Sequence, residues 1–396
     1  MRSGHSPDSS VGAVQMIACR RRAVALVLVA VVIPVLLGVA ALTVDVAYLY
    51  GVRSDLQNAA DAAALAGAGA LAGDTMMQVR MGTEGSIGMV EYTGEGHINL
   101  VSSLNSSLAR QGTVIGSSDV IFGWLDLLSA TSAVQNGVPL SQFNAVHVQA
   151  RRTDDSANGP VTLLFAQIFG QSTTEVTASA VAVYDDRMSA FDTNESPGGV
   201  LPFTVHTDLF AADFAGGPDD YEYDPITEST FSGSDGIREI KLYPHDNSPG
   251  NFGLLNIGTP NQGTPGLRDH IDNGVPPEDF AAETGSAVLT FFDANGDSIT
   301  YDITGDPGLK ATLESNVAAR IGEVVGFFLH NAVSGSGANT VYTINDIRFG
   351  RLVYVNLNGN NKAVYLQPVS YTGGGVVLSS VAPSSGGQVG RLVLAR

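Results

Sequence analysis

The stretch that decides the fold is AVALVLVAVVIPVLLGVAALTV, residues 23–44. Its 22 residues include no charged side chain. At a rise of about 1.5 Å per residue, an α-helix over this stretch would be about 33 Å long, enough to cross the hydrocarbon core of a bilayer. Pro34 lies in its middle and removes one backbone donor, which membrane helices tolerate. The sequence therefore predicts one transmembrane helix.

Charges flank this stretch unequally. Arg20, Arg21 and Arg22 directly precede it, and Asp45 follows it. Because basic residues remain on the cytoplasmic side, the arginines are a topology signal: residues 1–22 are expected to be a cytoplasmic tail and the chain after Asp45 to be extracytoplasmic. A cleaved secretory signal is the alternative, although the apolar run exceeds the ~7–15 residues of a usual signal core.

The helical pattern continues past the apolar stretch. Small and apolar residues recur at steps of three and four up to Ala70, and no proline lies between Val35 and Gly73. One continuous helix is therefore predicted over residues 23–73. Small side chains allow close approach of another element, and the predicted helix packing face consists of Leu56, Ala59, Ala63 and Gly67. This face is expected to pack either on the chain's own domain or on a partner's helix.

The block RRRAVALVLVAVVIPVLLGVAALTVDVAYLYGVRSDLQNAADAAALAGAGAL, residues 20–71, resembles the N-terminal segment of the TadG-like proteins of the Tad (Flp-type) pilus-assembly system. The arginine cluster, the proline-containing span, Asp45 with Tyr48 and Tyr50, and the string LQNAADAAALAGA carry the resemblance. The strings FNAVHVQARR and LLFAQIFGQSTTEVTASAVAVY, within residues 140–186, extend it less specifically to a strand–helix–strand unit.

The resemblance implies a single-pass component of the inner (cytoplasmic) membrane that supports the secretion of thin pili, with its C-terminal region in the periplasm. Longer relatives carry a von Willebrand A domain, whose Asp-x-Ser-x-Ser metal site has no counterpart in this sequence. Metal-dependent adhesion of that type is therefore not expected. A glutamate just inside the apolar run, typical of a processed prepilin, is also missing, so a retained anchor is expected.

The predicted fold class is α+β: a long N-terminal transmembrane α-helix, a small α/β sheet domain and a mostly antiparallel β second domain. The polar stretch DTNESPGG, residues 192–199, is the candidate boundary, which divides the exported chain into a pilin-like α+β domain (74–191) and a β-rich domain (192–396). Apolar runs predict strands, and proline and glycine positions predict turns. The first domain is predicted to contain a glycine-rich loop over 82–96, strands over 120–125, 145–152 and 175–184, and a short helix over 160–170.

The second domain is predicted from the same signals. Asn295-Gly296, a preferred two-residue turn, is expected to join two strands within 288–303. The other predicted elements are strands over 237–243, 324–329, 347–356 and 362–371, a helix over 312–319, and long loops over 244–286.

Composition limits the chemistry of the exported region. The formal net charge of the 396 residues is −19, with +3 in residues 1–53 and −22 in the remainder (15 basic and 37 acidic residues), which disfavours nucleic-acid binding. Cys19 is the only cysteine, and the seven histidines are scattered. The acidic runs 293–297 and 219–224 are interpreted as a hairpin turn and a solvated loop, with calcium binding as the alternative. No catalytic, cofactor-binding or metal-binding residue is expected, and no small-molecule substrate is evident.

The resulting hypothesis is a membrane-anchored structural or assembly component of a Tad (Flp-type) pilus system without catalytic activity. Its expected partners are the lipid bilayer and other pilus-assembly proteins. The alternative is an envelope adhesin or ligand-binding module that shares the same anchor.

Overall fold

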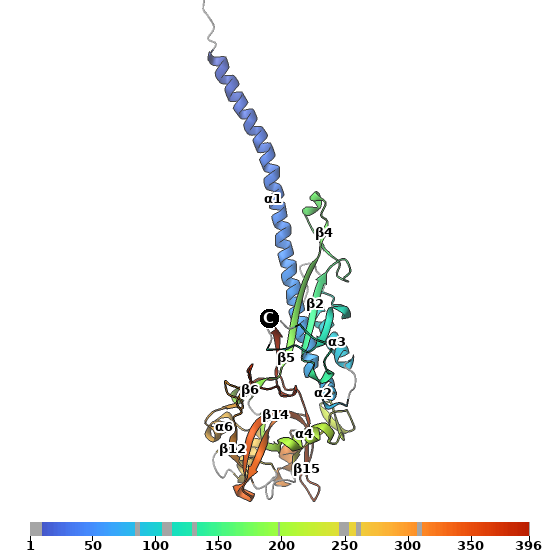
Figure 1. Cartoon of the computed structure of the whole chain (residues 1–396), viewed down its shortest axis with the longest axis vertical. Helices are drawn as coiled ribbons and strands as arrows, with labels where there is room; N and C mark the ends of the chain where they lie inside the picture. Colours follow the sequence, from blue (N-terminus) through green and yellow to red (C-terminus); the bar gives the residue numbers. More distant parts are fainter. Residues whose placement is uncertain are drawn as a thin grey trace, which may run out of the picture.

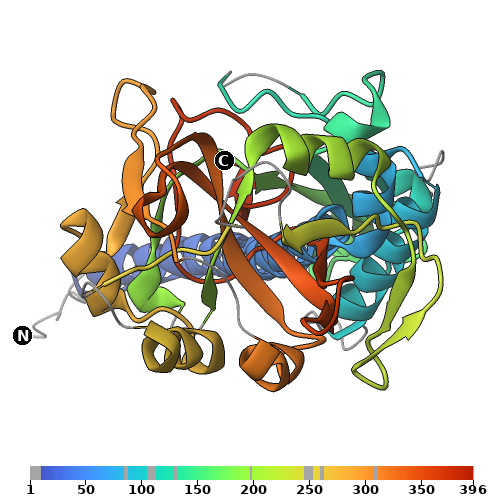
Figure 2. The same cartoon turned by 90° about the horizontal axis from the view of Figure 1, so that it is seen from below.

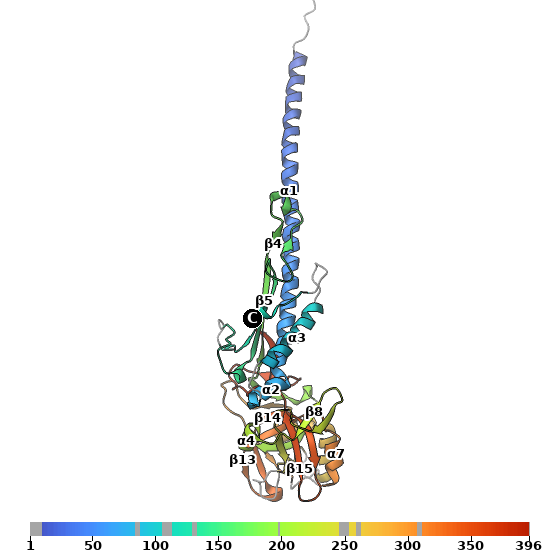
Figure 3. The ribbon, with the colours of Figure 1, turned by 90° about the vertical axis from the view of Figure 1, so that its right-hand side faces the viewer.

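A computed structural model of the chain describes residues 10–83, 88–104, 113–128, 133–196, 199–244, 253–258, 263–306 and 311–395. A single long helix, the stalk, extends from a body made of two sheet-containing parts, as Figures 1 and 3 show. The part nearer the stalk contains α2, α3, a four-stranded sheet and the two-stranded sheet β3-β4, and the distal part contains the remaining sheets.

The stalk is α1 (Ser10–Gly69), a helix of 60 residues with Pro34 inside it. It is followed by the 3₁₀ turn η1 (Ala70–Ala72), α2 (Asp74–Met81) and α3 (Gly88–Leu104). The predicted continuous helix is confirmed, but it begins at Ser10 rather than Ala23, because arginine and alanine favour helix and no proline lies between Asp8 and Arg22. The predicted loop over 82–96 is wrong for residues 88–96, which belong to α3.

The sheet beside the stalk has the order β1-β2-β5-β17 and is antiparallel throughout. Its strands are β1 (Val120–Gly123), β2 (Ala145–Arg152), β5 (Val176–Asp185) and β17 (Arg391–Ala395). The outer half of α1 packs on β2, β5 and α3 and shares one hydrophobic core with them. The three strands predicted between residues 120 and 184 are confirmed.

The C-terminal strand β17 returns to this first sheet from the far end of the sequence. It pairs with β5 from Arg391 opposite Asp185 to Ala395 opposite Val181. Residues 391–395 therefore lie with the elements that precede residue 192. The division of the exported chain at residue 192 stays a prediction.

The distal part, here called the β body (residues 188–389), is built on a six-stranded sheet of order β10-β15-β14-β13-β7 with β12 beside β14. All pairs in it are antiparallel except β13 with β7. The strands are β7 (Val200–His206), β10 (Ile240–Tyr243), β12 (Tyr301–Thr304), β13 (Val324–Ser334), β14 (Val341–Asn356) and β15 (Ala363–Pro368). The predicted mostly antiparallel β region is confirmed, and so is the pairing of 347–356 with 362–371.

Both faces of this large sheet are covered. Phe327 packs in a core with α4 (Thr207–Gly216), α5 (Gly263–Asn273) and α7 (Glu314–Ala318), whereas the next residue, Phe328, packs with α6 (Pro277–Thr284) in a core on the other face. Successive strand residues point to opposite faces of the sheet. A strand that is buried on both faces therefore requires a continuous apolar run, such as residues 325–329. Helices lie at the periphery of the β body and the large sheet lies inside it (Figure 2).

Smaller elements complete the β body. The three-stranded sheet β11-β6-β16 lies on the second core, and β8 pairs with β9 as a separate hairpin. Their bounds are β6 (Met188–Asp192), β8 (Tyr221–Asp224), β9 (Ser229–Ser232), β11 (Val288–Thr290) and β16 (Val376–Leu378). Short 3₁₀ turns lie at Ser117–Asp119, Leu140–Gln142, Thr193–Glu195, Ala311–Leu313 and Gly337–Asn339.

Two predictions for the β body are corrected. The expected long loops over 244–286 contain α5 and α6, because their apolar residues pack against the large sheet. The expected hairpin over 288–303 has its turn at Gly296 (φ +85°), but its outer strands separate: β11 pairs with β6, and β12 pairs with β14. Tertiary pairing thus overrides the local hairpin.

Candidate membrane anchor and its apolar finger

The apolar first half of the stalk is exposed. The helical segment Leu26–Ala72 is long and apolar enough to cross a membrane, and 0% of its most apolar 18-residue window is buried inside the molecule. Leu26 and Leu37, for example, are 71% and 64% exposed. A core helix of a soluble protein would bury such side chains, so the segment fits a single-pass membrane anchor.

The predicted topology signal lies at the beginning of this segment. The backbone of Arg20, Arg21 and Arg22 is part of α1, whereas their side chains lie outside the described part of the structure. The orientation that they predict remains a prediction.

The predicted packing face of the stalk lies against the chain's own domain. Leu56, Ala59 and Ala63 are fully buried. Gly67 is the tightest position, since a Cβ atom there would lie 2.7 Å from Cδ1 of Ile98 in α3 and 3.2 Å from Cγ1 of Val146 in β2. The face is therefore occupied by α3 and the first sheet, and the absence of a side chain at residue 67 sets how closely they approach.

A hairpin inserted between β2 and β5 lies along the stalk, toward its N-terminal end. This feature, called here the finger (residues 161–174), consists of β3 (Val161–Thr162), the 3₁₀ turn η4 (Ala166–Phe169) and β4 (Thr173–Thr174). Figures 1 and 3 show it beside α1, extending away from the β body. The helix predicted over 160–170 is thus wrong in its length: only the tip is helical, and its flanks pair as strands.

Asp45 of α1 holds the finger. Its Oδ1 accepts hydrogen bonds from the backbone N–H groups of Leu164 (2.8 Å) and Phe165 (3.2 Å), and its Oδ2 accepts them from Phe165 (3.0 Å) and Ala166 (2.6 Å). Asp45 is only 3% exposed. These N–H groups lie just before and at the N-terminus of η4, where backbone donors have no helical carbonyl partner, so the carboxylate fixes the tip to the stalk.

The tip of the finger is apolar and exposed. Leu164, Phe165, Ile168 and Phe169 are 59%, 38%, 77% and 65% exposed. Sequence reasoning missed this surface, although one signal was available: residues 160–174 contain no charged residue. It also assigned Asp45 no contact.

The helix α2 joins the stalk to the β body. Arg80 donates hydrogen bonds to the Leu71 carbonyl (2.9 Å), the Gly387 carbonyl (2.8 Å) and Ser370 Oγ (2.8 Å), and burial lowers the pKa of its guanidinium. Across the same junction, Arg238 donates to the Met81 carbonyl at 2.7 Å. These contacts couple the stalk to the β body through buried charge-assisted hydrogen bonds.

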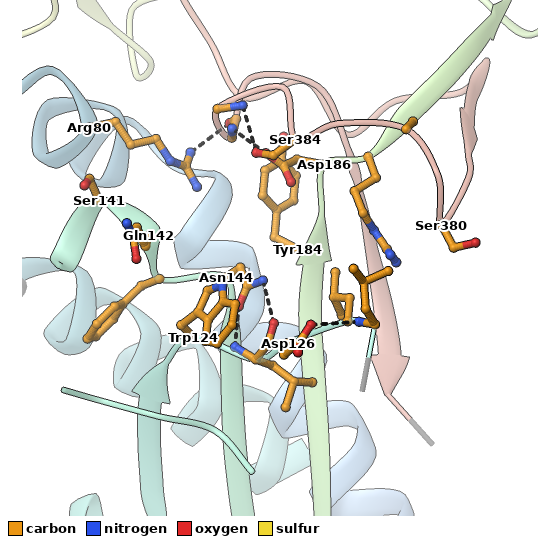
Figure 4. A pocket seen from close by; sticks show the side chains of 18 of the residues that line it. Arg80, Trp124, Asp126, Ser141, Gln142, Asn144, Tyr184, Asp186, Ser380 and Ser384 are labelled. Carbon is orange, nitrogen blue, oxygen red and sulfur yellow. Dashed lines mark hydrogen bonds between the residues drawn. The ribbon is translucent and has the colours of Figure 1, made fainter. Parts of the chain in front are cut away.

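A pocket of about 520 Å³ lies beside this junction, between the β1 end of the first sheet and the loop 380–387 (Figure 4). Trp124, Tyr184 and Arg80 line it. The Asp186 carboxylate in its wall accepts hydrogen bonds from Ser384 Oγ (2.5 Å) and the Gly387 N–H (2.7 Å). The charged groups here therefore hold the loop against the pocket.

Carboxylates of the acidic runs accept local hydrogen bonds, and the solvated loop expected over 219–224 is wrong for Tyr221–Asp224, which form strand β8. The Asp293 carboxylate accepts the N–H groups of Asn295 and Asp297, as expected for a tight turn, and Asp219 accepts those of Asp235 and Gly236. Within the described ranges, no group of three or more His, Cys, Asp or Glu side chains is placed to hold a metal ion.

Comparison with known families finds one match, and it lies on the stalk. Residues 23–70 match the family model described as "Putative Flp pilus-assembly TadE/G-like". The N-terminal segment resembles a TadE/G-like Tad domain. No curated protein and no solved structure matches the chain.

The Tad domain coincides with the stalk. It contains the exposed apolar segment, the finger-holding Asp45 and the buried packing face up to Gly67. The finger and the β body lie outside it. The resemblance to TadG-like proteins predicted for the N-terminal segment is confirmed, and the Tad domain supports a component of a Flp pilus system.

Proposed function

We propose that this protein is a membrane-anchored structural component of a Flp-type pilus-assembly system. The observation that carries the proposal is the coincidence of the Tad domain with an exposed apolar helix long enough to cross a membrane. In this proposal α1 crosses the inner membrane once, with its N-terminus in the cytoplasm and the first sheet and β body in the periplasm. Arg20–Arg22 before the apolar stretch support this orientation.

The function follows from position rather than from catalysis. The packing of α1 on the first sheet and the Arg80 contacts at the junction support a rigid link between the membrane helix and the β body. A body held at a set distance and orientation presents one surface to other pilus-assembly proteins. The protein would then act as a scaffold that binds such partners outside the membrane.

Deletion of the protein in its host, followed by quantification of sheared surface pili, tests the proposed role. We expect the deletion to abolish or strongly reduce the pili and the full-length protein to restore them. A Gly67→Leu variant, in which the stalk cannot pack closely on its domain, is expected to restore fewer pili than a Gly69→Leu control, because a Cβ atom at Gly69 meets no atom within 4 Å. Normal pili in the deletion strain would refute the assembly role.

The orientation has its own test, because Cys19 is the only cysteine. A membrane-impermeant maleimide added to cells with a permeabilised outer membrane should label Ile226→Cys, whose native side chain is 91% exposed on the β body, but not Cys19. Labelling of Cys19 before lysis would refute the proposed orientation.

The pocket beside Trp124 favours a second candidate function, a binding module on the same anchor. Deletion would then leave pili intact and reduce attachment of the cells to surfaces. A Trp124→Ala variant that restores pili but not attachment would assign the pocket to binding.

A further inference from the structure

The finger carries an apolar surface that the anchor alone does not require. Its four exposed apolar residues lie at one end of a hairpin, where a water-exposed loop would normally be polar. Exposed apolar clusters of this kind mark surfaces that contact another molecule or a membrane. The position of the finger relative to α1 decides whether this surface contacts another molecule or a membrane.

The tip lies beside the apolar segment of α1, on the membrane side of Asp45. A Cβ atom built on Gly38 would be 3.9 Å from Cζ of Phe169. Ala41 and Gly38, the stalk residues one and two turns before Asp45, are shielded relative to their exposed neighbours. Gly38 precedes Val44, the end of the uncharged stretch, by six residues, which is about 9 Å along the helix axis. The apolar surface of the finger is therefore continuous with that of the proposed membrane span.

The charge pattern fits a membrane boundary at the base of the finger. No charged residue lies between Pro160 and Thr174, and Glu175 follows at once. Glu175 lines a shallow pocket together with Tyr50 and Arg53 of α1. Tyrosine is typical of the interface between lipid and water. The exposed charges of both elements therefore begin at the same level, whereas Asp45 is buried against the finger.

Backbone hydrogen bonding in the finger also fits a lipid environment, where each unpaired polar group costs several kcal/mol. Besides the three N–H groups held by Asp45, those of Leu163, Ile168, Gly170 and Gln171 donate to carbonyl oxygens within the finger. The Gln167 side chain folds back and donates to the Leu163 carbonyl. The tip thus directs its apolar side chains outward and pairs these polar groups internally.

We propose that the finger inserts into the outer half of the bilayer beside α1, with lipid acyl chains covering Leu164, Phe165, Ile168 and Phe169. The inference rests on the proposed membrane anchoring of α1. Two elements held together by the buried Asp45 carboxylate then enter the membrane side by side. A helix alone can rotate about its axis, whereas a helix with a laterally attached finger has one preferred rotational setting, which orients the β body relative to the membrane surface.

The test uses the full chain in nanodiscs of phosphatidylcholine and phosphatidylglycerol. In a Cys19→Ser background, single cysteines are introduced as Phe169→Cys on the finger, Val39→Cys on α1 and Ile226→Cys on the β body; all three native side chains are more than half exposed. We expect an impermeant maleimide to label Phe169→Cys and Val39→Cys at least about tenfold more slowly than Ile226→Cys, because lipid excludes the reagent and disfavours the thiolate. A fluorophore attached at residue 169 should be quenched by spin-labelled lipid.

Each other outcome is decisive. Rapid labelling of Phe169→Cys while Val39→Cys stays protected would overturn the finger insertion and leave the anchor intact. Rapid labelling at both positions would refute the membrane anchoring itself. Protection of residue 169 without quenching by spin-labelled lipid would show that protein, such as a second copy of this chain, covers the finger, and would overturn the inference. An Ile168→Cys variant repeats the measurement at a second finger side chain, which is 77% exposed. A folding defect caused by Phe169→Cys alone would then be recognised, because the two variants would disagree.

Discussion

Replacing Asp45 by alanine removes the acceptor of all the hydrogen bonds that hold the finger to α1. Three backbone N–H groups, those of Leu164, Phe165 and Ala166, lose their partner in a site where Asp45 itself is 3% exposed. A hydrogen bond to a charged group contributes about 1.5–3 kcal/mol, and an unsatisfied buried donor costs about 1–3 kcal/mol. The gross loss over three donors would be about 4–9 kcal/mol by that range.

The finger can relax, and neighbouring contributions are not additive, so we expect a net loss of about 3 kcal/mol in docking of the finger. That corresponds to about a 100-fold change in the equilibrium between docked and undocked finger. Asp45→Asn keeps one acceptor oxygen without the charge, and we expect it to lose about half as much, roughly tenfold.

Hydrogen exchange of the purified full chain in mild detergent, read by mass spectrometry, measures this equilibrium. The peptide that covers residues 161–174 should exchange about 100-fold faster in Asp45→Ala, while peptides from β2 remain unchanged. Ser54→Ala, an exposed polar position of the same helix, is the matched control. Equal exchange of the finger in Asp45→Ala and Ser54→Ala would refute the role of the carboxylate.

Three further predictions concern stability. Gly67→Ala should lower the free energy of unfolding by about 1–3 kcal/mol, because its Cβ atom overlaps packed side chains, whereas Gly69→Ala should be neutral or stabilising by up to about 1 kcal/mol; denaturant titration compares them. Arg80→Met should cost about 3 kcal/mol, because buried carbonyl groups lose a charged donor, and Arg391→Met on the exposed sheet edge should cost little. Burial raises the pKa of Glu239 to about 7 from 4.5, so the free energy of unfolding should fall as the pH rises from about 4.5 to 7. Urea titrations at several pH values measure this dependence, and Glu239→Gln should reduce it.

The sign of the pH prediction follows from linkage. The folded state binds the Glu239 proton more tightly than the unfolded chain does, so the folded state is favoured at pH values below the raised pKa. At 1.36 kcal/mol per pKa unit, the contribution is at most about 3 kcal/mol. Identical slopes in wild type and Glu239→Gln would contradict the assignment. Equal unfolding midpoints of Gly67→Ala and Gly69→Ala would contradict the role of Gly67. Equal losses of unfolding free energy in Arg80→Met and Arg391→Met would contradict the role of Arg80 at the junction.

Local patterns predicted several elements correctly. The uncharged stretch 23–44 and the alanine-rich segment after it are sufficient for a helix whatever they contact, because helical hydrogen bonds join residues four apart. The alternation within 145–152 and 176–185 likewise predicted β2 and β5, because half-buried strands require it.

Local patterns were insufficient where residues distant in the sequence come into contact. Helix α3 contains glycines, and Gly94 lies so close to Phe122 that a Cβ atom would be 2.3 Å from its ring; a glycine-rich string that reads as a loop is here a helix packed tightly on a strand. Strand β17 becomes part of the first sheet only through its pairing with β5, some 200 residues earlier in the chain.

The sequence by itself determined the long apolar helix, its predicted orientation and the α+β class, because hydropathy, flanking charge and periodicity are local properties. Only the tertiary structure decided what Asp45 does. In the sequence it marks the end of an apolar run, whereas in the fold it accepts hydrogen bonds from a tip 119 to 121 residues away. A carboxylate's role depends on which donors surround it, and those donors are brought together by the packing of β3 and β4 beside α1, which no local pattern encodes.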